Sequence, residues 1–333
     1  MNTDLILGNL LNAPMLFFAL GLVATLAGTE LELPDPMGRF FASFLLLAIG
    51  LRGGAELARA GYSTDMALTL GTATVASALM PFYLYVAARR RFDGATAAAL
   101  AAAYGSVSAV LFACALNLLQ AAHLPFSGYM NAALAAMEAP AIVSGVLIYQ
   151  GHRGRAEATL TGRARPPLKV LEVLRLAFGT DSLWLLLGSL VVGVVVGEAG
   201  WRALKPCFGD LFQGVLCFFL LDQGSRCAFK LDSLKGVGAY ALGFAIAASL
   251  VNALVGLVLA RLLGLSPGNA FLFVVLLASS SYLAVPAAMR EAIPTANAAI
   301  YVTLPLAVTF PFNVVVGLPL YLAAVRWLIG GGA

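Results

Sequence analysis

Stretches of about 20 apolar residues follow one another along almost the whole chain, separated by short polar segments. A helix needs roughly 20 such residues to cross the hydrocarbon core of a bilayer. Only 11% of the 333 residues are charged and 61% are hydrophobic, whereas soluble domains carry about 25% charged residues. So few charges could not solvate the surface of a soluble fold of this size. The sequence therefore predicts an all-α integral membrane protein embedded in a lipid bilayer.

Ten segments have the length and hydropathy of a membrane-spanning helix. They cover residues 13–29, 38–59, 65–88, 94–119, 127–149, 180–198, 206–230, 236–263, 268–291 and 297–329. The polar stretch between the fifth and sixth segments is shorter than the ~40 residues that an isolated domain usually needs. We therefore expect a first five-helix unit over 1–149, a basic linker over 150–178 and a second five-helix unit over 179–333.

Basic residues are unevenly distributed among the predicted loops. Loops on the same side as the linker hold 14 of the 20 Lys and Arg residues, and the opposite loops hold 6. Because cytoplasmic loops carry an excess of Lys and Arg, we expect a cytoplasmic linker and both termini on the outer side of the cell inner (plasma) membrane. Five spans in each unit then require the two units to have opposite orientations.

Short motifs recur in the two units in the same order. The matched pairs are 49–59 with 220–230, 94–97 with 268–270, 105–108 with 279–282, and 137–140 with 308–311. Their offsets stay between about 171 and 174 residues, as expected for one ancestral unit copied once. Together with the opposite orientations, the ordered matches predict two inverted five-helix repeats.

The predicted fourth and ninth spans each contain a Ser/Gly cluster near the middle. Gly costs a helix about 1 kcal/mol relative to Ala, and unpaired backbone in hydrocarbon is tolerated only beside a ligand or a cavity. We therefore predict discontinuous fourth and ninth helices, whose half-helix N-termini would favour an anion. The alternative is that these small residues only allow close helix packing. The anion-binding candidates are Gly105, Ser106, Val107, Ser108, Ser279, Ser280, Ser281 and Tyr282.

Glu138 lies inside the predicted fifth span, where a carboxylate is costly and commonly functional. It could bind a cation, carry a proton or pair with Arg52, or it could be a structural residue. Asp222 precedes Arg226 by one helical turn, which predicts an ordinary ion pair. The candidates for cation coupling are Glu138, Ser108, Ser281 and Thr309.

Histidine and cysteine usage argues against a metal centre or an enzyme. His123 and His152 are predicted to lie in loops, away from the serine clusters, so an intramembrane serine hydrolase would lack a base near its nucleophile. The net charge of +4 is small and scattered, so no nucleic-acid partner is expected. We expect the cysteines to be buried small residues. They are Cys114, Cys207, Cys217 and Cys227.

The order of these motifs resembles the cyanobacterial-type sodium-dependent bicarbonate transporter family. The resembling segments are 49–54 (IGLRGG), 105–108 (GSVS), 137–140 (MEAP), 278–281 (ASSS) and 293–297 (IPTAN). The resemblance implies ten spans in two inverted repeats, core and gate domains, and a homotrimer. It also implies bicarbonate held between the broken helices, sodium beside it, and a PII-like cytoplasmic regulator.

Two motifs depart from that family. Its Ser run continues with Asp where this chain has Tyr282, and its Gly-x-Val-Ser motif continues with Gly-Ser-Thr where this chain has residues 109–111 (AVL). These changes remove oxygen ligands for sodium but leave backbone N–H donors in place.

The leading hypothesis is a secondary active transporter of a small anion, bicarbonate, by symport with sodium. Alternatives are another small anion or carboxylate, with proton coupling through Glu138 or no coupling, and a passive channel or a sensor. No cofactor is expected other than sodium as the coupling ion.

Overall fold

The computed structural model describes residues 12–29, 31, 33–61, 63–161, 170–231 and 238–330. These residues form helices and connecting turns, and no strand occurs within these ranges. The helices of the first half are α2 (Ala13–Leu26), α3 (Asp35–Ala60), α4 (Thr64–Ala88), α5 (Gly94–Gly105), α6 (Ala109–Ala121) and α7 (Tyr129–Thr161). The prediction of an all-α protein is confirmed.

The second half begins with α8 (Val170–Phe178), α9 (Asp181–Phe208), α10 (Phe212–Leu231), α11 (Ala239–Leu262), α12 (Pro267–Ala278) and α13 (Ala284–Ala292). It ends with α14 (Ala298–Tyr301), η2 (Leu304–Thr309), α15 (Phe310–Phe312), η3 (Asn313–Gly317) and α16 (Leu318–Leu328). The stretches η2 and η3 are π-helical and flank Pro311, where the sequence places a proline inside the last predicted span. Such π-helical turns often mark functional sites in membrane and soluble helices alike.

Seven segments of the described chain are long and apolar enough to cross a membrane. They are Pro36–Ala60, Thr64–Ala88, Gly94–Ala121, Tyr129–His152, Asp181–Phe208, Ala239–Leu262 and Ala298–Leu328. The other three predicted spans also coincide with helices, but each differs from a simple span. Helix α2 has 14 residues, α10 carries Asp222, Arg226 and Lys230, and the segment at 268–291 is split into α12 and α13.

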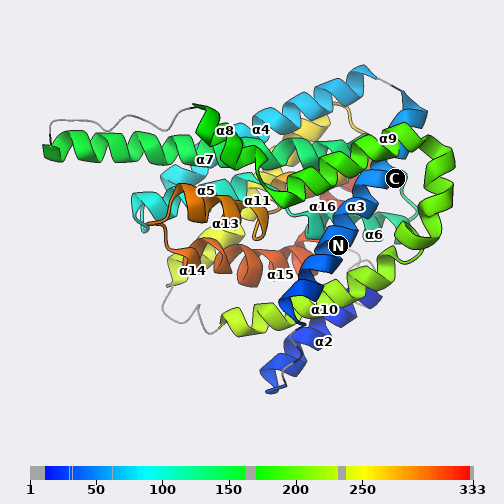
Figure 1. Ribbon diagram of the computed structural model, residues 1–333, viewed down its shortest axis with the longest axis horizontal. Helices are drawn as coiled ribbons and strands as arrows, with labels where there is room; N and C mark the ends of the chain where they lie inside the picture. Colours follow the sequence, from blue (N-terminus) through cyan, green and yellow to red (C-terminus); the bar gives the residue numbers. More distant parts are fainter. Residues whose placement is uncertain are drawn as a thin grey trace.

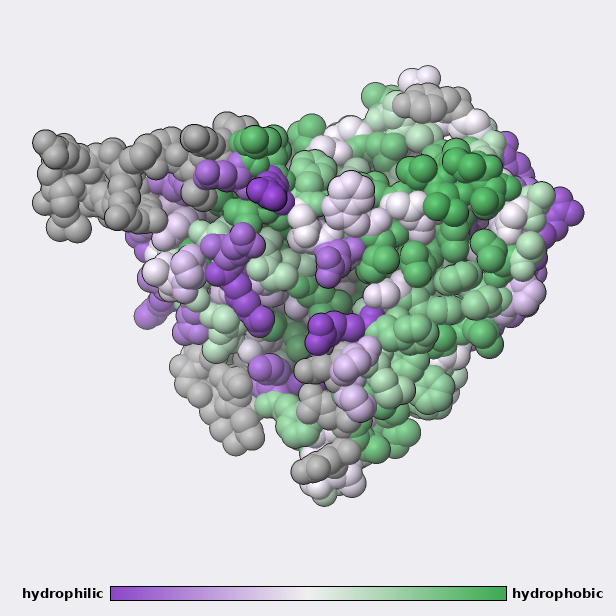
Figure 2. Space-filling model, viewed as in Figure 1, coloured by the Kyte–Doolittle hydropathy of each residue, from purple (hydrophilic) through white to green (hydrophobic). Residues whose placement is uncertain are grey.

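Large apolar side chains cover much of the exterior. Val195 is 78% exposed, Leu262 77% and Trp184 69%. Figure 2 shows apolar side chains over the face formed by α9 and α10, with hydrophilic side chains gathered near the middle of the view. An exposed apolar surface of this extent is unfavourable in water and favourable against lipid. The protein is therefore a multi-pass membrane protein.

Two pairs of helices pack closely, and each pair joins the two halves of the sequence. Helix α2 lies along α10, and α3 lies along α9 (Figure 1). A Cβ added at Gly54 would lie 2.1 Å from the carbonyl oxygen of Leu190, and one added at Gly224 would lie 2.1 Å from that of Phe18. Small residues allow this close approach of backbones. The same contact thus occurs twice, with the roles of the two halves exchanged.

The linker region differs from its prediction. Helix α7 continues past the predicted end of its span at residue 149 to Thr161, and α8 occupies 170–178, while residues 162–169 lie outside the described chain. His152 lies on α7, so its predicted loop position is wrong, whereas His123 does lie in a turn. The predicted burial of Cys207 is also wrong, because that residue is exposed on α9.

Helix α9 changes direction inside its length. Gly197 has φ 59° and ψ −159°, a conformation that is open to glycine and strained for other residues. The predicted span at 180–198 therefore ends at this corner, and residues 198–208 form a separate helical arm that leads toward α10.

Candidate functional site

The helix at the predicted fourth span is interrupted at its Ser/Gly cluster. Helix α5 ends at Gly105, Ser106 is extended with φ −95° and ψ −178°, and α6 begins at Ala109. Ser108 caps α6, because its hydroxyl oxygen accepts a 3.2 Å hydrogen bond from the amide of Leu111. This is the discontinuity that the cluster predicts.

The predicted ninth span has the same kind of interruption. Helix α12 ends at Ala278, Ser279 is extended with φ −74° and ψ 172°, and α13 begins at Ala284. The Ser281 hydroxyl oxygen accepts a 3.2 Å hydrogen bond from the amide of Val285 in the first turn of α13. Serine side chains therefore satisfy one first-turn amide of each second half-helix, and other first-turn amides have no intrahelical acceptor.

The two interruptions cross and bond to each other. The Ser108 amide donates to the Ser279 hydroxyl oxygen at 3.0 Å, and the Ser281 amide donates to the Ala103 carbonyl oxygen at 2.8 Å. The structure thus brings together segments that lie about 171 residues apart in sequence. The Ser108 and Ser281 amides, which were expected to be free to bind an anion, instead hold the two interruptions together. The sequence did not predict these bonds.

The carbonyl groups freed by each interruption are capped by a neighbouring helix. Ser77 on α4 donates to the Gly105 carbonyl oxygen at 3.0 Å, and it also contacts the Met137 carbonyl oxygen. Ser249 on α11 donates to the Ala278 carbonyl oxygen at 2.8 Å. The equivalent residue thus performs the same role in each half. Neither serine was predicted as a site residue, although their spacing of 172 residues fits the offsets of the repeat.

A network of buried amides and hydroxyls surrounds the end of α12. The Asn313 side-chain amide donates to the Ala278 carbonyl oxygen at 3.2 Å, and the Tyr321 hydroxyl donates to Asn313 Oδ1 at 2.7 Å. Asn313 is the first residue of η3, and the π-helical turn changes the direction in which side chains leave the helix relative to an α-helix. A single polar residue between apolar neighbours gives little sequence signal, so this residue was also missed.

Two cavities lie toward opposite ends of α3 and α10. The larger one has a volume of about 1960 Å³ and is lined by the first part of α3 and the last part of α10, together with residues from α7, α8, α9 and α13. The smaller one has a volume of about 660 Å³ and is lined by the last part of α3 and the first part of α10. Of the eight residues predicted for the anion site, Tyr282 lines the larger cavity.

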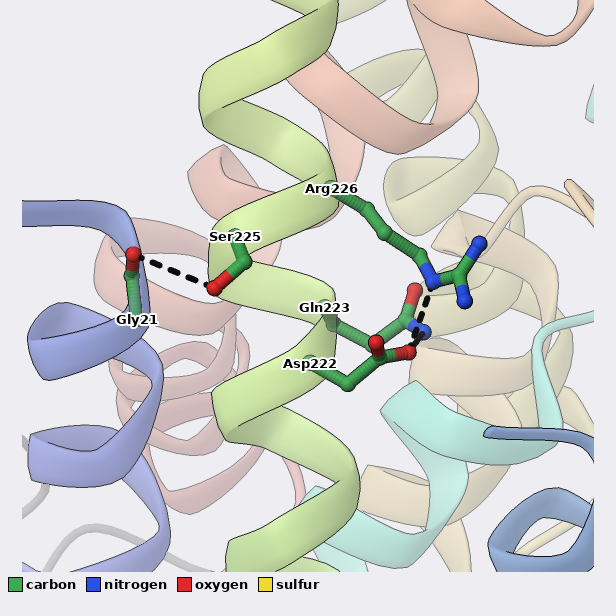
Figure 3. Close-up of polar contacts among 5 residues, drawn as sticks. All are labelled: Gly21, Asp222, Gln223, Ser225 and Arg226. Atoms are coloured by element: carbon green, nitrogen blue, oxygen red, sulfur yellow. Dashed lines mark hydrogen bonds and ion pairs between the residues drawn. The ribbon is translucent and has the colours of Figure 1, made fainter. Parts of the chain in front are cut away.

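An ion pair on α10 lines the same cavity. Asp222 is fully buried, and its Oδ2 atom accepts hydrogen bonds from Arg226 Nε at 2.7 Å and from Gln223 Nε2 at 3.3 Å. Figure 3 shows these three side chains on one side of α10, while Ser225 points the other way toward Gly21. The predicted pairing of Asp222 with Arg226 is confirmed.

The four residues predicted for cation coupling are separated into different contacts. Glu138 is 5% exposed and accepts a short hydrogen bond from Ser182 at the start of α9. Thr309 lies in η2 and is 2.6 Å from the Tyr104 hydroxyl. Arg52 pairs with Glu56 rather than with Glu138, so that predicted alternative for Glu138 is wrong. Ser108 and Ser281 remain at the crossing.

Comparison with known proteins identifies the family of this chain. A family model described as the Na+-dependent bicarbonate transporter superfamily matches residues 13–326. The chain belongs to this superfamily. A search of curated proteins gave no match. This match confirms the resemblance drawn from the sequence motifs. Because the superfamily is a family of transporters and not of enzymes, the protein is a transporter rather than an enzyme.

Proposed function

We propose that this protein is a secondary active transporter that moves bicarbonate across the inner (plasma) membrane in symport with sodium. The observation that carries the proposal is the crossing of two interrupted helices beside a large cavity, in a member of the Na+-dependent bicarbonate transporter superfamily. Interrupted helices in transporters place polar backbone groups at membrane depth, where substrates and coupling ions bind.

The proposed architecture is ten spans in two inverted five-helix repeats, over 1–149 and 179–333, joined by a cytoplasmic linker over 150–178. Three pairs of equivalent contacts support it. The close glycine contacts between α3 and α9 and between α2 and α10 form the first pair, and the capping serines of α4 and α11 form the second. The third is the Asn297 amide bonded to Thr96 and the Ser127 amide bonded to Asn269.

In this proposal the four helices α2, α3, α9 and α10 form the gate domain, and the helices around the two interruptions form the core domain. The anion lies at the crossing, between the second half-helices α6 and α13. Amides of their first turns, the Ser108 hydroxyl and the Tyr282 hydroxyl would donate to it. Movement of the core against the gate would open the site to the two cavities in turn.

The larger cavity is proposed to face the cytoplasm. Five basic residues line it, and all five lie on the side that the distribution of Lys and Arg assigns to the cytoplasm. They are Arg39, Arg175, Arg226, Lys230 and Arg290. A homotrimer and a PII-like cytoplasmic regulator are further proposals that rest on the family resemblance. Native mass spectrometry of the purified protein tests the trimer.

Uptake of radiolabelled bicarbonate into proteoliposomes tests the proposed function. Short time points at alkaline pH are needed because carbon dioxide crosses lipid without a carrier, and liposomes without protein measure that leak. We expect saturable accumulation that increases with an inward sodium gradient. The absence of protein-dependent uptake under every gradient would refute the proposal.

A second candidate is the same transport coupled to protons, and the burial of Glu138 favours it as the carrier. Its hydrogen bond from Ser182 joins α7 of the proposed core to α9 of the proposed gate, so a change in its protonation would act between the moving parts. Under this alternative, Glu138→Gln abolishes the dependence of uptake on a pH gradient. Uptake that keeps its gradient dependence in this variant would assign Glu138 a structural role.

A further inference from the structure

Four buried polar atoms of residues that line the larger cavity have no hydrogen-bond partner among the described residues. They are Gln150 Nε2, Thr180 Oγ1, Asp222 Oδ1 and the hydroxyl of Tyr282. Asp222 and Tyr282 are the two that lie on α10 and at the crossing. Asp222 is 0% exposed and Tyr282 is 6% exposed. Buried polar groups without a partner are rare in folded proteins and call for an explanation, such as a ligand that supplies the missing bonds.

Asp222 and Tyr282 reach the cavity wall from different elements. Asp222 lies on α10, and Tyr282 lies in the interruption between α12 and α13. They do not bond to each other. Any group that satisfies both atoms must therefore lie between α10 and the crossing.

The other oxygen of Asp222 is already held in place. Arg226 Nε and Gln223 Nε2 both donate to Oδ2, which fixes the carboxylate and leaves Oδ1 as an acceptor (Figure 3). An ionised carboxylate can only accept hydrogen bonds. The missing partner of Oδ1 must therefore be a donor.

Tyr282 is held by packing rather than by hydrogen bonds. Its ring lies edge-on to Phe310, with the ring centroids 5.6 Å apart. Ser108 lies near its hydroxyl without reaching hydrogen-bond geometry. Because the Ser108 oxygen already accepts from Leu111, its own proton is available for an acceptor. Tyr282 and Ser108 can thus both donate to the same ligand.

We propose that Asp222 and Tyr282 together recognise a bound oxyanion that retains one hydroxyl group. The charged oxygens of the anion accept from Tyr282 and Ser108, and its hydroxyl donates to Asp222 Oδ1. This inference rests on the proposed function. The hydrogen bond from the anion's hydroxyl to Asp222 makes the site selective for hydrogen carbonate over oxyanions of similar size that have no O–H group, such as nitrate and formate.

A metal cation is a poorer partner for Asp222. A cation on Oδ1 would lie within a few ångströms of the Arg226 guanidinium, which already neutralises this carboxylate. A neutral O–H donor meets no such repulsion. The charge on the carboxylate also strengthens a hydrogen bond from a hydroxyl.

Asp222→Asn provides the test, because it keeps the shape of the side chain and replaces the free acceptor atom. It also removes the negative charge that pairs with Arg226. The Asn oxygen can keep the bond from Arg226, which places the Asn NH2 group where Oδ1 was. An acceptor then becomes a donor. Ser225→Ala on the opposite face of α10 is the matched control, since Ser225 bonds to the Gly21 carbonyl oxygen away from the cavity.

The measurement is radiolabelled bicarbonate uptake in proteoliposomes, with nitrate and formate as competitors. We expect Asp222→Asn to raise the KM for bicarbonate about tenfold or more, because a charge-assisted hydrogen bond is lost. Nitrate and formate should compete more strongly in this variant than in the native protein. Tyr282→Phe should weaken the binding of bicarbonate and of nitrate by the same factor. Ser225→Ala should change neither the KM for bicarbonate nor the competition by nitrate.

Each outcome decides a separate point. If the native protein takes up no bicarbonate, the proposed function fails. If it does, and Asp222→Asn keeps the native preference for bicarbonate over nitrate, this inference alone is overturned. A change confined to sodium dependence would also overturn it. Should the Asn variant fail to assemble, competition in the native protein decides, because nitrate that competes as well as bicarbonate contradicts the proposal.

Discussion

Close packing of α3 on α9 depends on Gly54, and this dependence can be measured. A Cβ at Gly54 would lie 2.1 Å from the Leu190 carbonyl oxygen, about 1.3 Å inside the 3.4 Å at which ordinary contact begins. Backbone atoms cannot move aside as a flexible side chain can, so the two helices must separate. Forced overpacking of this kind costs about 1–3 kcal/mol. We expect Gly54→Ala to lower the stability of the protein by that amount.

The equivalent contact in the other half makes the prediction sharper. Gly224 meets the Phe18 carbonyl oxygen at the same 2.1 Å, so Gly224→Ala should cost a similar amount. Gly188 on α9 and Gly214 on α10 have open space around them, and alanine there should be neutral or stabilising by up to about 1 kcal/mol. Thermal unfolding in detergent compares the four variants. Equal melting temperatures for Gly54→Ala and Gly188→Ala would refute the reasoning.

Three further predictions concern the ends of helices. Ser77→Ala leaves the buried Gly105 carbonyl group at the end of α5 without its donor and should destabilise the protein by about 1–3 kcal/mol in the same unfolding assay; a neutral result would show that another donor replaces Ser77. Partial burial opposes ionisation of Asp93 at the start of α5, but hydrogen bonds from Thr96 and Ala95 outweigh it and lower the pKa of this carboxylate. Asp93→Ala should therefore cost about 1 kcal/mol at neutral pH. The difference should begin to shrink as the pH falls below about 4, where the unfolded-state carboxylate binds a proton, and should be lost only below the lowered pKa of the native carboxylate; a difference independent of pH would contradict this. Cys207 is the exposed cysteine, so a membrane-impermeant maleimide added outside intact cells should label it, and labelling only after lysis would reverse the proposed orientation.

The sequence predicted the helical fold and both interruptions because their causes are local. Apolar runs of spanning length predict helices, and the clusters at 105–108 and 279–282 contain residues that end helices. The predicted span boundaries agree with most helices to within a few residues. The corner at Gly197 was missed because a single glycine at the end of an apolar run has no distinctive local pattern.

The polar contacts around the crossing could not be predicted, because they join residues far apart in the chain. Ser77 and Ser249 look like ordinary polar residues of apolar helices until the helices pack against the freed carbonyls. Asp222 presents the same difficulty. Its pairing with Arg226 follows from a four-residue spacing, but its unpartnered oxygen becomes visible only when α10 lies against the crossing.

A structure determined in the presence of bicarbonate tests the central claim most directly. The two crossing interruptions should hold the anion, with density beside Tyr282 and Ser108 and within hydrogen-bond distance of both hydroxyls. A matched structure without bicarbonate identifies density that belongs to water. Density for the anion elsewhere, with the crossing unchanged and empty in both structures, would contradict the account.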